Sequence, residues 1–433
     1  MLQYMDKGNN KPMATRVYYG EYTLRHWVDL MLTSGVVLPE YQRSFVWDES
    51  DVKRLLSSMN SGQFILPVTI AHYKDEEKEQ NLILDGQQRL TSALLAYLGY
   101  MPIKEQFKSA DINLAYGDDS DEDEQVSSIE WTYKLLLKEE QKLNTVTKVQ
   151  ERLRTDVRYK ELKVEIEGDI DEFYDKTFLG FSFIIPSESD ANATQRYFSA
   201  LFRNMNYHGK KLSPLESRRS LYFMNREYKD FFDGKTENGE DVLCNIRILE
   251  NMQPRKIDFL RYLSMLSQLM VVKNNEIKRV MVGYSAYSSR ENYYADYVSY
   301  IVKLEQESRK DKFDGFNIET TFPNHEWKER FKTIKDYLER NKAKLGLDEK
   351  NVAFTSWIDA DYWLYGLLDT VLFKGKTIVR EEDLTEELIN EIKMKRQVKE
   401  NDTPSEYQRN PNRIGNLRDR IERSLDIYRR HAE

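Results

Sequence analysis

The sequence has a single cysteine, Cys244, and its five histidines are scattered along the 433 residues. One cysteine excludes an internal disulfide and a cysteine-based zinc site, and no two histidines stand at metal-ligand spacing. No apolar run approaches the roughly 20 residues of a membrane span, and residues 1–14 lack the apolar stretch of a secretory signal. These absences lead us to expect a cytoplasmic protein with no membrane partner.

Basic residues are fewer than acidic ones, because the chain has 65 lysines and arginines and 73 aspartates and glutamates, which gives a net charge of −8. Such a protein does not coat nucleic acid through its overall field, so any such contact must come from a local basic patch. Hydrophobic residues make up 40% of the chain, and there are 28 tyrosines, which is enough for packed cores. The length predicts two or three domains.

The hydrophobic periodicity of the first hundred residues predicts a compact α+β unit. Thr23 and Asp48 stand where helix caps are expected, and apolar residues at three- and four-residue spacing follow each of them. Two short strands are expected near residues 68–71 and 81–84. The second strand is expected to run through a glycine turn into a helix over residues 88–97.

Residues 178–186 form an apolar run that is expected to return to the same sheet as a further strand. Beyond this run, helical spacing dominates and predicts a mainly α-helical C-terminal region. The expected helices cover residues 194–205, 214–231, 257–272, 293–309, 325–341, 357–373 and 414–430. We therefore expect an N-terminal domain at residues 15–190, with an acidic and helical insertion near 105–175. A mainly helical part at 191–433 would provide partner or DNA contacts.

The strand-to-helix turn at residues 83–91 (ILDGQQRLT) is the strongest candidate for a functional site. A strand that runs through a glycine into a helix points backbone N–H groups at one spot, where the helix dipole adds partial positive charge. Gly86 lets the backbone approach an anion closely, and Arg89 carries a planar set of donors suited to phosphate. Gln87 and Gln88 can donate to phosphate oxygens or orient a water molecule.

Asp85, at the end of the expected strand, could hold Mg²⁺ or accept a hydrogen bond from a ribose hydroxyl. The structural alternative is that Asp85 caps the helix and that Arg89 is an ordinary surface residue. The doubled glutamine beside Arg89 argues against this alternative, because two amides in a first helical turn have no obvious folding purpose.

The second cluster is Tyr41-Gln42-Arg43, which is followed by the aromatic Phe45. Arg43 is the second cation expected on a phosphate, and Tyr41 or Phe45 is available to stack on a base. The alternative is that aromatic residues here belong to the core and that Arg43 pairs with an acid.

Residues 38–48 (LPEYQRSFVWD) and 82–91 (LILDGQQRLT) together resemble the N-terminal module of the GmrSD type IV restriction enzymes and related phage-defence proteins. That module is similar to members of the ParB/sulfiredoxin-like superfamily, which implies a small α+β domain with a mixed sheet. A third element agrees with the family pattern, namely a Phe-rich helix followed by Asn206, Gly209 and a Leu-Ser-x-x-Glu sequence that ends at Glu216. The resemblance covers residues 20–225.

The resemblance implies nucleotide binding, often with nucleoside-triphosphate (NTP) hydrolysis, coupled to the sensing of modified DNA and the control of a nuclease. Carried over position by position, the motif residues here are Tyr41, Gln42, Arg43, Asp85, Gly86, Gln87, Gln88 and Arg89. Thr91 matches the hydroxyl residue that usually follows the second motif.

The first hypothesis is therefore a nucleotide-binding enzyme or switch in bacterial defence, with a separate nuclease partner. The phosphates of an NTP of unspecified base would lie on the amides of residues 86–88, Asp85 would hold Mg²⁺, and Gln87 or Gln88 would orient the attacking water. The expected catalytic residues are Asp85, Gln87, Gln88 and Arg89. The expected nucleotide-binding residues are Tyr41, Gln42, Arg43, Gly86, Thr91, Asn206 and Lys210.

The second hypothesis is a non-enzymatic module that binds DNA or a modified base and recruits a nuclease. Its support is the best local basic patch of the chain, at residues 196–229. The expected nucleic-acid contacts are Lys211, Arg218, Arg219 and Arg226. The alternative for this patch is a solvated helical face.

A metal-dependent nuclease that uses Asp85 is a third hypothesis. Many relatives carry a C-terminal HNH nuclease module with a histidine close before a proline and a later Ile-Gly-Asn-Leu. This chain has that tetrapeptide at residues 414–417, but no histidine lies between His325 and His431, which argues against an intrinsic HNH centre. The arginine-rich segment 409–430 is expected to be an exposed, salt-bridged helix or a contact of a homo-oligomer.

Overall fold

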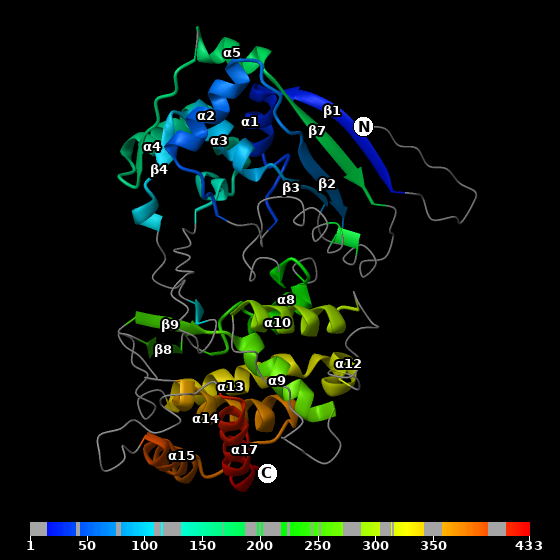
Figure 1. Ribbon diagram of the computed structural model, residues 1–433, viewed down its shortest axis with the longest axis vertical. Helices are drawn as coiled ribbons and strands as arrows, with labels where there is room; N and C mark the ends of the chain where they lie inside the picture. Colours follow the sequence, from blue (N-terminus) through cyan, green and yellow to red (C-terminus); the bar gives the residue numbers. More distant parts are fainter. Residues whose placement is uncertain are drawn as a thin grey trace, which may run out of the picture. The chain divides into compact units, whose positions relative to one another are not determined.

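The computed structural model separates the chain into two compact units, residues 1–109 with 128–212 and residues 110–127 with 213–433 (Figure 1). The residues that the structure describes are 15–39, 44–74, 79–107, 114–115, 131–166, 168–186, 197–198, 201, 218–222, 226–243, 246–250, 253–271, 287–303, 313, 316–341, 357–396 and 413–433.

A four-stranded mixed sheet with the order β1-β7-β2-β3 forms the framework of the first unit. Strand β1 (Arg16–Thr23) is antiparallel to β7 (Phe178–Ile185), which runs parallel to β2 (Val68–Lys74). Strand β3 (Glu79–Asp85) completes the sheet antiparallel to β2. The α+β class, the mixed sheet and the return of residues 178–186 are therefore confirmed.

Helices α1 (Leu24–Leu32) and α2 (Glu49–Asn60) begin at the two caps expected from the sequence. The Thr23 hydroxyl accepts a hydrogen bond from the backbone N–H of His26, and Asp48 forms a reciprocal capping box with Asp51. These side chains satisfy N–H groups that the first helical turn leaves unpaired.

Helix α3 (Gln87–Leu98) is the central helix of the first unit, because eleven of its residues are buried. It packs against α1 and α2 in one apolar core. The remaining elements of the unit are β4 (Tyr100–Pro102), η1 (Lys104–Phe107), η3 (Tyr133–Leu136), η4 (Gln141–Leu143), α4 (Val146–Thr155), β6 (Tyr159–Glu161) and α5 (Ile170–Lys176). Within the insertion that the sequence places near residues 105–175, the described helices are interrupted by short turns and a strand.

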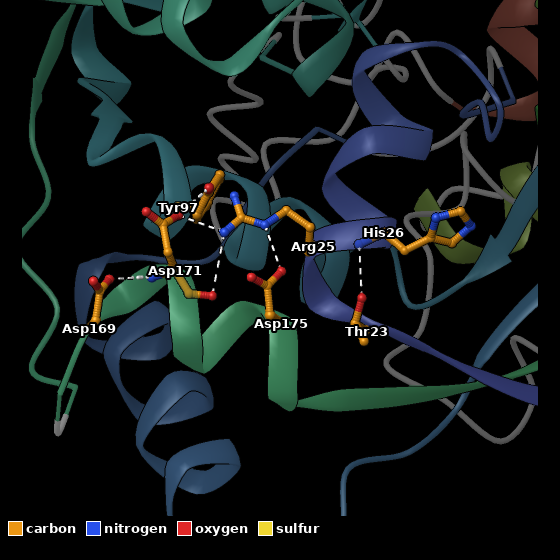
Figure 2. A network of polar contacts seen from close by, with 7 residues as sticks. All are labelled: Thr23, Arg25, His26, Tyr97, Asp169, Asp171 and Asp175. Carbon is orange, nitrogen blue, oxygen red and sulfur yellow. Dashed lines mark hydrogen bonds and ion pairs between the residues drawn. The ribbon is translucent and has the colours of Figure 1, made fainter.

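A polar network joins α1, α3 and α5 on the surface of the first unit (Figure 2). Arg25 donates to Asp175 at 2.9 Å and to Asp171 at 2.6 Å, and its guanidinium lies over the Tyr97 ring. The Tyr97 hydroxyl donates to the same Asp171 carboxylate at 2.6 Å. This network ties α5 to the C-terminal end of α3, while the candidate turn lies at the other end of that helix.

The second unit is mainly α-helical and also contains a small sheet that the periodicity does not predict. That sheet has the order β5-β9-β8. The described strands of the second unit are β5 (Leu114–Ala115), β8 (Arg247–Glu250) and β9 (Gln253–Ile257). Its described helices are α8 (Arg226–Asp233), α9 (Phe259–Val271), α10 (Tyr287–Ile301), α12 (Ile318–Thr321), η6 (Pro323–His325), α13 (Trp327–Asn341), α14 (Trp357–Leu367), the π-helical turn η7 (Leu368–Phe373), α15 (Glu381–Arg396) and α17 (Ile414–Arg430). None of the helices in the described ranges is long and apolar enough to cross a membrane.

Helix α17 corrects the expectation of an exposed arginine-rich helix. Leu417, Ile421, Leu425 and Tyr428 are buried, and Arg420 has no exposed surface at all. The helix packs closely on α14, where a Cβ atom at Gly366 would lie 2.1 Å from the Tyr428 ring. The prediction failed because the count of charged residues masked an apolar face with helical spacing.

Candidate functional site

The candidate turn joins the end of β3 to the start of α3. The register between β2 and β3 shifts so that Leu84 is an extra residue, and this bulge comes directly before Asp85. Gly86 is the N-terminal cap residue of α3 and has φ 91° and ψ 7°, in the left-handed region. A Cβ atom at this position would lie 2.9 Å from Cγ2 of Val68. Conformation and packing therefore both require glycine here.

Gln88 connects the turn to residues 44–47, which directly follow Tyr41-Gln42-Arg43. Its Oε1 accepts hydrogen bonds from the backbone N–H of Val46 at 2.9 Å and of Trp47 at 3.4 Å, and its Nε2 donates to the Ser44 carbonyl at 3.1 Å. The side chain is 6% exposed. The doubled glutamine thus has the folding purpose that the sequence did not reveal, because Gln88 satisfies the backbone of an extended segment.

Two further contacts hold the same segment in place. The backbone N–H of Phe45 donates to the Trp131 carbonyl at 2.8 Å, and Lys104 Nζ donates to the Val46 carbonyl at 2.9 Å. Phe45 is buried and meets the Trp131 ring edge to face. Phe45 is therefore a core residue, as the structural alternative had it, and is not available to stack on a base.

Arg89 binds two parts of the first unit at once. Its Nη2 forms an ion pair with Asp85 Oδ2 at 2.5 Å, and its Nη1 donates to the carbonyls of Leu66 and Pro67. The Arg89 side chain is 13% exposed, whereas that of Asp85 is 56% exposed. Asp85 does not cap α3, since no side chain caps the first turn of this helix. Asp85 is thus not a helix cap, and Arg89 is not an isolated surface arginine.

Gln87 and Thr91 lie below the surface of the turn. Gln87 is 5% exposed, and Thr91 is 1% exposed. The Thr91 and Ser92 hydroxyls are buried, and neither has a hydrogen-bond partner among the described residues. Among the described residues of the turn, the open face consequently consists of Asp85 with part of Arg89, while Gln87, Gln88 and Thr91 are buried.

Several predicted site residues lie outside the described residues. They are Tyr41, Gln42, Arg43, Asn206, Lys210 and Lys211, together with the side chain of Arg226. Residues 37–39 and 44–47, on either side of Tyr41-Gln42-Arg43, are described, and both sides are held in the first unit by hydrogen bonds. Val37 forms two backbone hydrogen bonds to β3, at Asn81 and Ile83, and Ser44 is bound by Gln88.

Arg218 is buried and does not belong to the predicted basic patch. This side chain is 4% exposed, pairs with Asp258 at 2.9 Å and lies over the Tyr294 ring, so it cannot reach a nucleic-acid backbone. The patch prediction failed at this residue because a helical arginine can be neutralised in a core by a distant aspartate. Arg219 is partly exposed and pairs with Asp233.

The two features of the sequence compared with an HNH module have local roles. The His325 ring contacts the Glu227 carboxylate, and residues 414–417 begin the core helix α17. Within the described ranges, no group of three His, Cys, Asp or Glu side chains could hold a metal ion. A single carboxylate with bound phosphates and water still suits Mg²⁺, which keeps several waters when bound to proteins. Asp85 fits that requirement.

Sequence reasoning missed the Leu66 and Pro67 carbonyls as partners of the turn, and Lys104 and Trp131 as partners of residues 44–47. Their contacts run through backbone atoms, and a sequence carries no signal for which backbone group a distant side chain will meet. The one available signal was the pair of adjacent glutamines, which was assigned to ligand contact instead.

Comparison with known proteins gives one family and one relative. Residues 27–223 match the family model of the GmrSD restriction endonuclease N-terminal domain. An uncharacterized protein of Methanocaldococcus jannaschii is 27% identical over 194 residues, which are 39% of this chain. The matched region spans 29% of the length of that relative. No solved structure matches the chain.

Proposed function

Because residues 27–223 match the family model of the GmrSD restriction endonuclease N-terminal domain, we propose that this protein is a nucleotide-binding, NTP-hydrolysing regulatory component of a restriction system. The single observation that carries the proposal is the turn at Gly86. There a left-handed glycine opens a buried helix, and an arginine stands within the first helical turn. Such a turn offers an anion the helix dipole and a guanidinium together.

The contacts of Arg89 suggest how phosphate would bind. Asp85 neutralises this guanidinium, and a triphosphate would compete with Asp85 for it. The Asp85 carboxylate released in this way would be free to hold Mg²⁺, which supplies charge neutralisation when bound. One side-chain pair would thus prepare both the phosphate contact and the metal contact.

Hydrolysis would be an attack by water on the γ-phosphorus. The bond between this phosphorus and the β–γ bridging oxygen breaks, and the products are a nucleoside diphosphate and phosphate, which accepts the proton of the water. Gln88 is unsuited to orient that water, because both ends of its amide already bind the backbone of residues 44–47. We therefore assign Gln88 to positioning, and Gln87, which is 5% exposed, would have to turn towards the ligand to orient the water.

The test compares Arg89→Ala with Arg54→Ala, a change to an exposed arginine of α2 that pairs with Asp51 on the same helix. Binding of ATP, GTP, CTP and UTP with Mg²⁺ is measured by calorimetry, and phosphate release is measured in parallel. Arg89→Ala is expected to weaken binding roughly tenfold or more, since it removes a charge-assisted contact to phosphate. Arg54→Ala should leave binding unchanged. Equal NTP binding by the wild type and Arg89→Ala would rule out the assigned site.

The biological output remains part of the same proposal. A regulator of this kind would act in bacterial phage defence through a separate nuclease subunit and would meet DNA through lysines and arginines at residues 196–229. Arg219 is a described member of that set, and its side chain is 42% exposed. Loss of salt-dependent DNA binding in Arg219→Ala, with NTP binding retained, is the expected result of a DNA-binding assay.

A further inference from the structure

The second unit contains a cavity of about 190 Å³ between α8, the end of α10 and the start of α12. Its floor is apolar, because Ile301 and Phe316 are both buried. Two half-buried aromatic side chains, Tyr228 and Tyr300, contribute to its walls. An apolar floor with aromatic walls suits a flat ring.

The rim of the cavity is polar and carries both signs of charge. Lys303, Asn317 and Glu319 line it, and all three are exposed. Neither Lys303 nor Glu319 forms an ion pair with a described residue. Asn317 is held by its own turn, since its Oδ1 accepts from the backbone N–H of Thr320 at 3.1 Å. A bound ring would therefore meet an ammonium donor and a carboxylate acceptor at the same rim.

The carboxylate of Glu319 influences the pKa of Tyr228, which lines the wall of the cavity. Burial raises the pKa of the Tyr228 hydroxyl, and the negative charges of Glu319 and Glu227 raise it further. The electrostatic influence of Glu319 on Tyr228 agrees with their placement on one cavity. The phenol consequently stays neutral beside the carboxylate.

Size selects the class of ligand. A cavity of roughly 150 Å³ is known to hold benzene, so about 190 Å³ holds one substituted six-membered ring and leaves little space for a second ring. A carboxylate accepts hydrogen bonds and therefore selects a ring with an amino group. The ammonium of Lys303 selects a ring oxygen or nitrogen acceptor beside it. Cytosine has this pattern, with an N4 amino donor next to acceptors, whereas uracil has a carbonyl oxygen in the place of the amino group.

We propose that this cavity binds a single aminopyrimidine ring, with Tyr228 and Tyr300 against its faces and Glu319 accepting from its amino group. The ring can come from a free nucleoside or from a cytosine that has left the stack of a DNA strand. This site belongs to the second unit and does not depend on nucleotide binding at Gly86.

The experiment uses the 433-residue chain and four probes, namely cytidine, uridine, a short single-stranded deoxycytidine oligonucleotide and the matched deoxyuridine oligonucleotide. Binding is measured by calorimetry and by saturation-transfer NMR on the base protons. Each cytosine probe is expected to bind at least tenfold tighter than its uracil-containing counterpart, since uracil presents a carbonyl oxygen to the carboxylate where cytosine presents its amino donor. Binding of both cytosine probes indicates a site for a free nucleoside, whereas binding of the oligonucleotide alone indicates an extruded base.

Two variants test the rim, and both are expected to fold. Glu319→Gln should weaken binding of the cytosine probe roughly tenfold by replacing a charged acceptor with a neutral one. Lys303 has φ 61° at the end of α10, so Lys303→Gly removes the ammonium at a position where glycine suits the backbone. It should also weaken binding. Glu329→Gln, an exposed change on α13, is the matched control and should have no effect.

The proposal is overturned if no cytosine probe binds, if uracil binds equally well, or if Glu319→Gln binds as the wild type does. Equal losses in Glu319→Gln and Glu329→Gln would overturn it as well, since the effect would then not come from the cavity. Arg89→Ala should bind cytidine normally. Failure of the nucleotide site and failure of this cavity are thus distinguishable.

Discussion

Gln88 connects two motifs that are forty residues apart in the sequence, because its amide binds the backbone of Ser44, Val46 and Trp47. Its neighbour Arg89 connects the same turn to Asp85 and to the loop at Leu66 and Pro67. Adjacent residues of one helical turn therefore face different parts of the domain. A ligand that draws Arg89 away from Asp85 would also loosen its hold on the loop.

Replacement of Gly86 by alanine is expected to damage the turn more than the same change at Gly99. Both glycines have a positive φ, but a Cβ atom at Gly86 would press on Val68, whereas nothing lies within 4 Å of one at Gly99. The left-handed conformation alone costs alanine about 1–2 kcal/mol, so Gly99→Ala should lose about that much stability. Gly86→Ala should lose more and also lose NTP binding. Chemical denaturation and calorimetry measure both effects, and equal losses in the two variants would contradict the packing argument.

Gln88→Met keeps the length of the side chain but removes its three hydrogen bonds. The partly buried backbone groups of Ser44, Val46 and Trp47 would then lose their partner, at a cost of at most about 1–3 kcal/mol for each group. Hydrogen exchange should rise in this segment, with little change in α9 of the other unit. Gln63→Met, in an exposed loop residue, is the control. Unchanged exchange at residues 44–47 would show that Gln88 does not hold them.

The helical caps were predictable from the sequence, because a cap depends on a few neighbouring residues. Thr23 and Asp48 act as expected, and so do the strands around residues 68–71 and 81–84. Strand β1 was missed because all but its last residue are exposed, so it has no alternation of buried and open positions. Its place in the sheet depends on β7, which is more than 150 residues away in the chain.

The role of Gly86 was also predictable from the sequence, since Asp-Gly between a strand and a helix signals a tight turn. The partners of the turn were not. Arg420 shows the same limit, because its sequence neighbours are charged while its actual partner, Asp361, lies on another helix. Long-range pairing of this kind depends on the packed fold, and a single sequence does not specify it.

Helix α2 carries a pH-dependent contact at its first turn. Glu49 binds Lys160 at 2.7 Å and Lys53 at 2.8 Å, and these lysines lower its pKa from 4.5 to about 2. Because the folded pKa is lowered, the stabilisation is present above pH 4.5 and is lost as the pH falls towards about 2. The difference in unfolding free energy between the wild type and Glu49→Gln should therefore shrink to zero over this window. Glu139→Gln, at an exposed residue, should show no such trend, and a difference that grew on acidification would contradict the ion pairs.

Each unit has its own apolar core, and the second core contains a buried ionic cluster. Asp361 accepts from Arg420 at 2.9 Å and also meets Arg261 and Tyr262. Arg420 and Asp361 have no exposed surface. The aspartate therefore compensates buried positive charge from two helices and helps to fix α9, α14 and α17 together.

Asp361→Asn should destabilise the second unit by about 3–5 kcal/mol, because it leaves buried arginines without their counter-charge. Hydrogen exchange should rise in α9, α14 and α17, while NTP binding at the Gly86 turn is retained. Asp426→Asn changes an exposed aspartate of α17 and should alter stability by less than about 0.5 kcal/mol. Loss of NTP binding in Asp361→Asn would contradict the assignment of the nucleotide site to the first unit alone.

The most direct test of the account is a crystal structure of the full chain with a non-hydrolysable NTP analogue and Mg²⁺. The account predicts triphosphate density against the backbone of residues 86–88, with Arg89 turned from Asp85 towards a phosphate and Asp85 facing the metal. Triphosphate density elsewhere, with the pair of Arg89 and Asp85 intact, would contradict it.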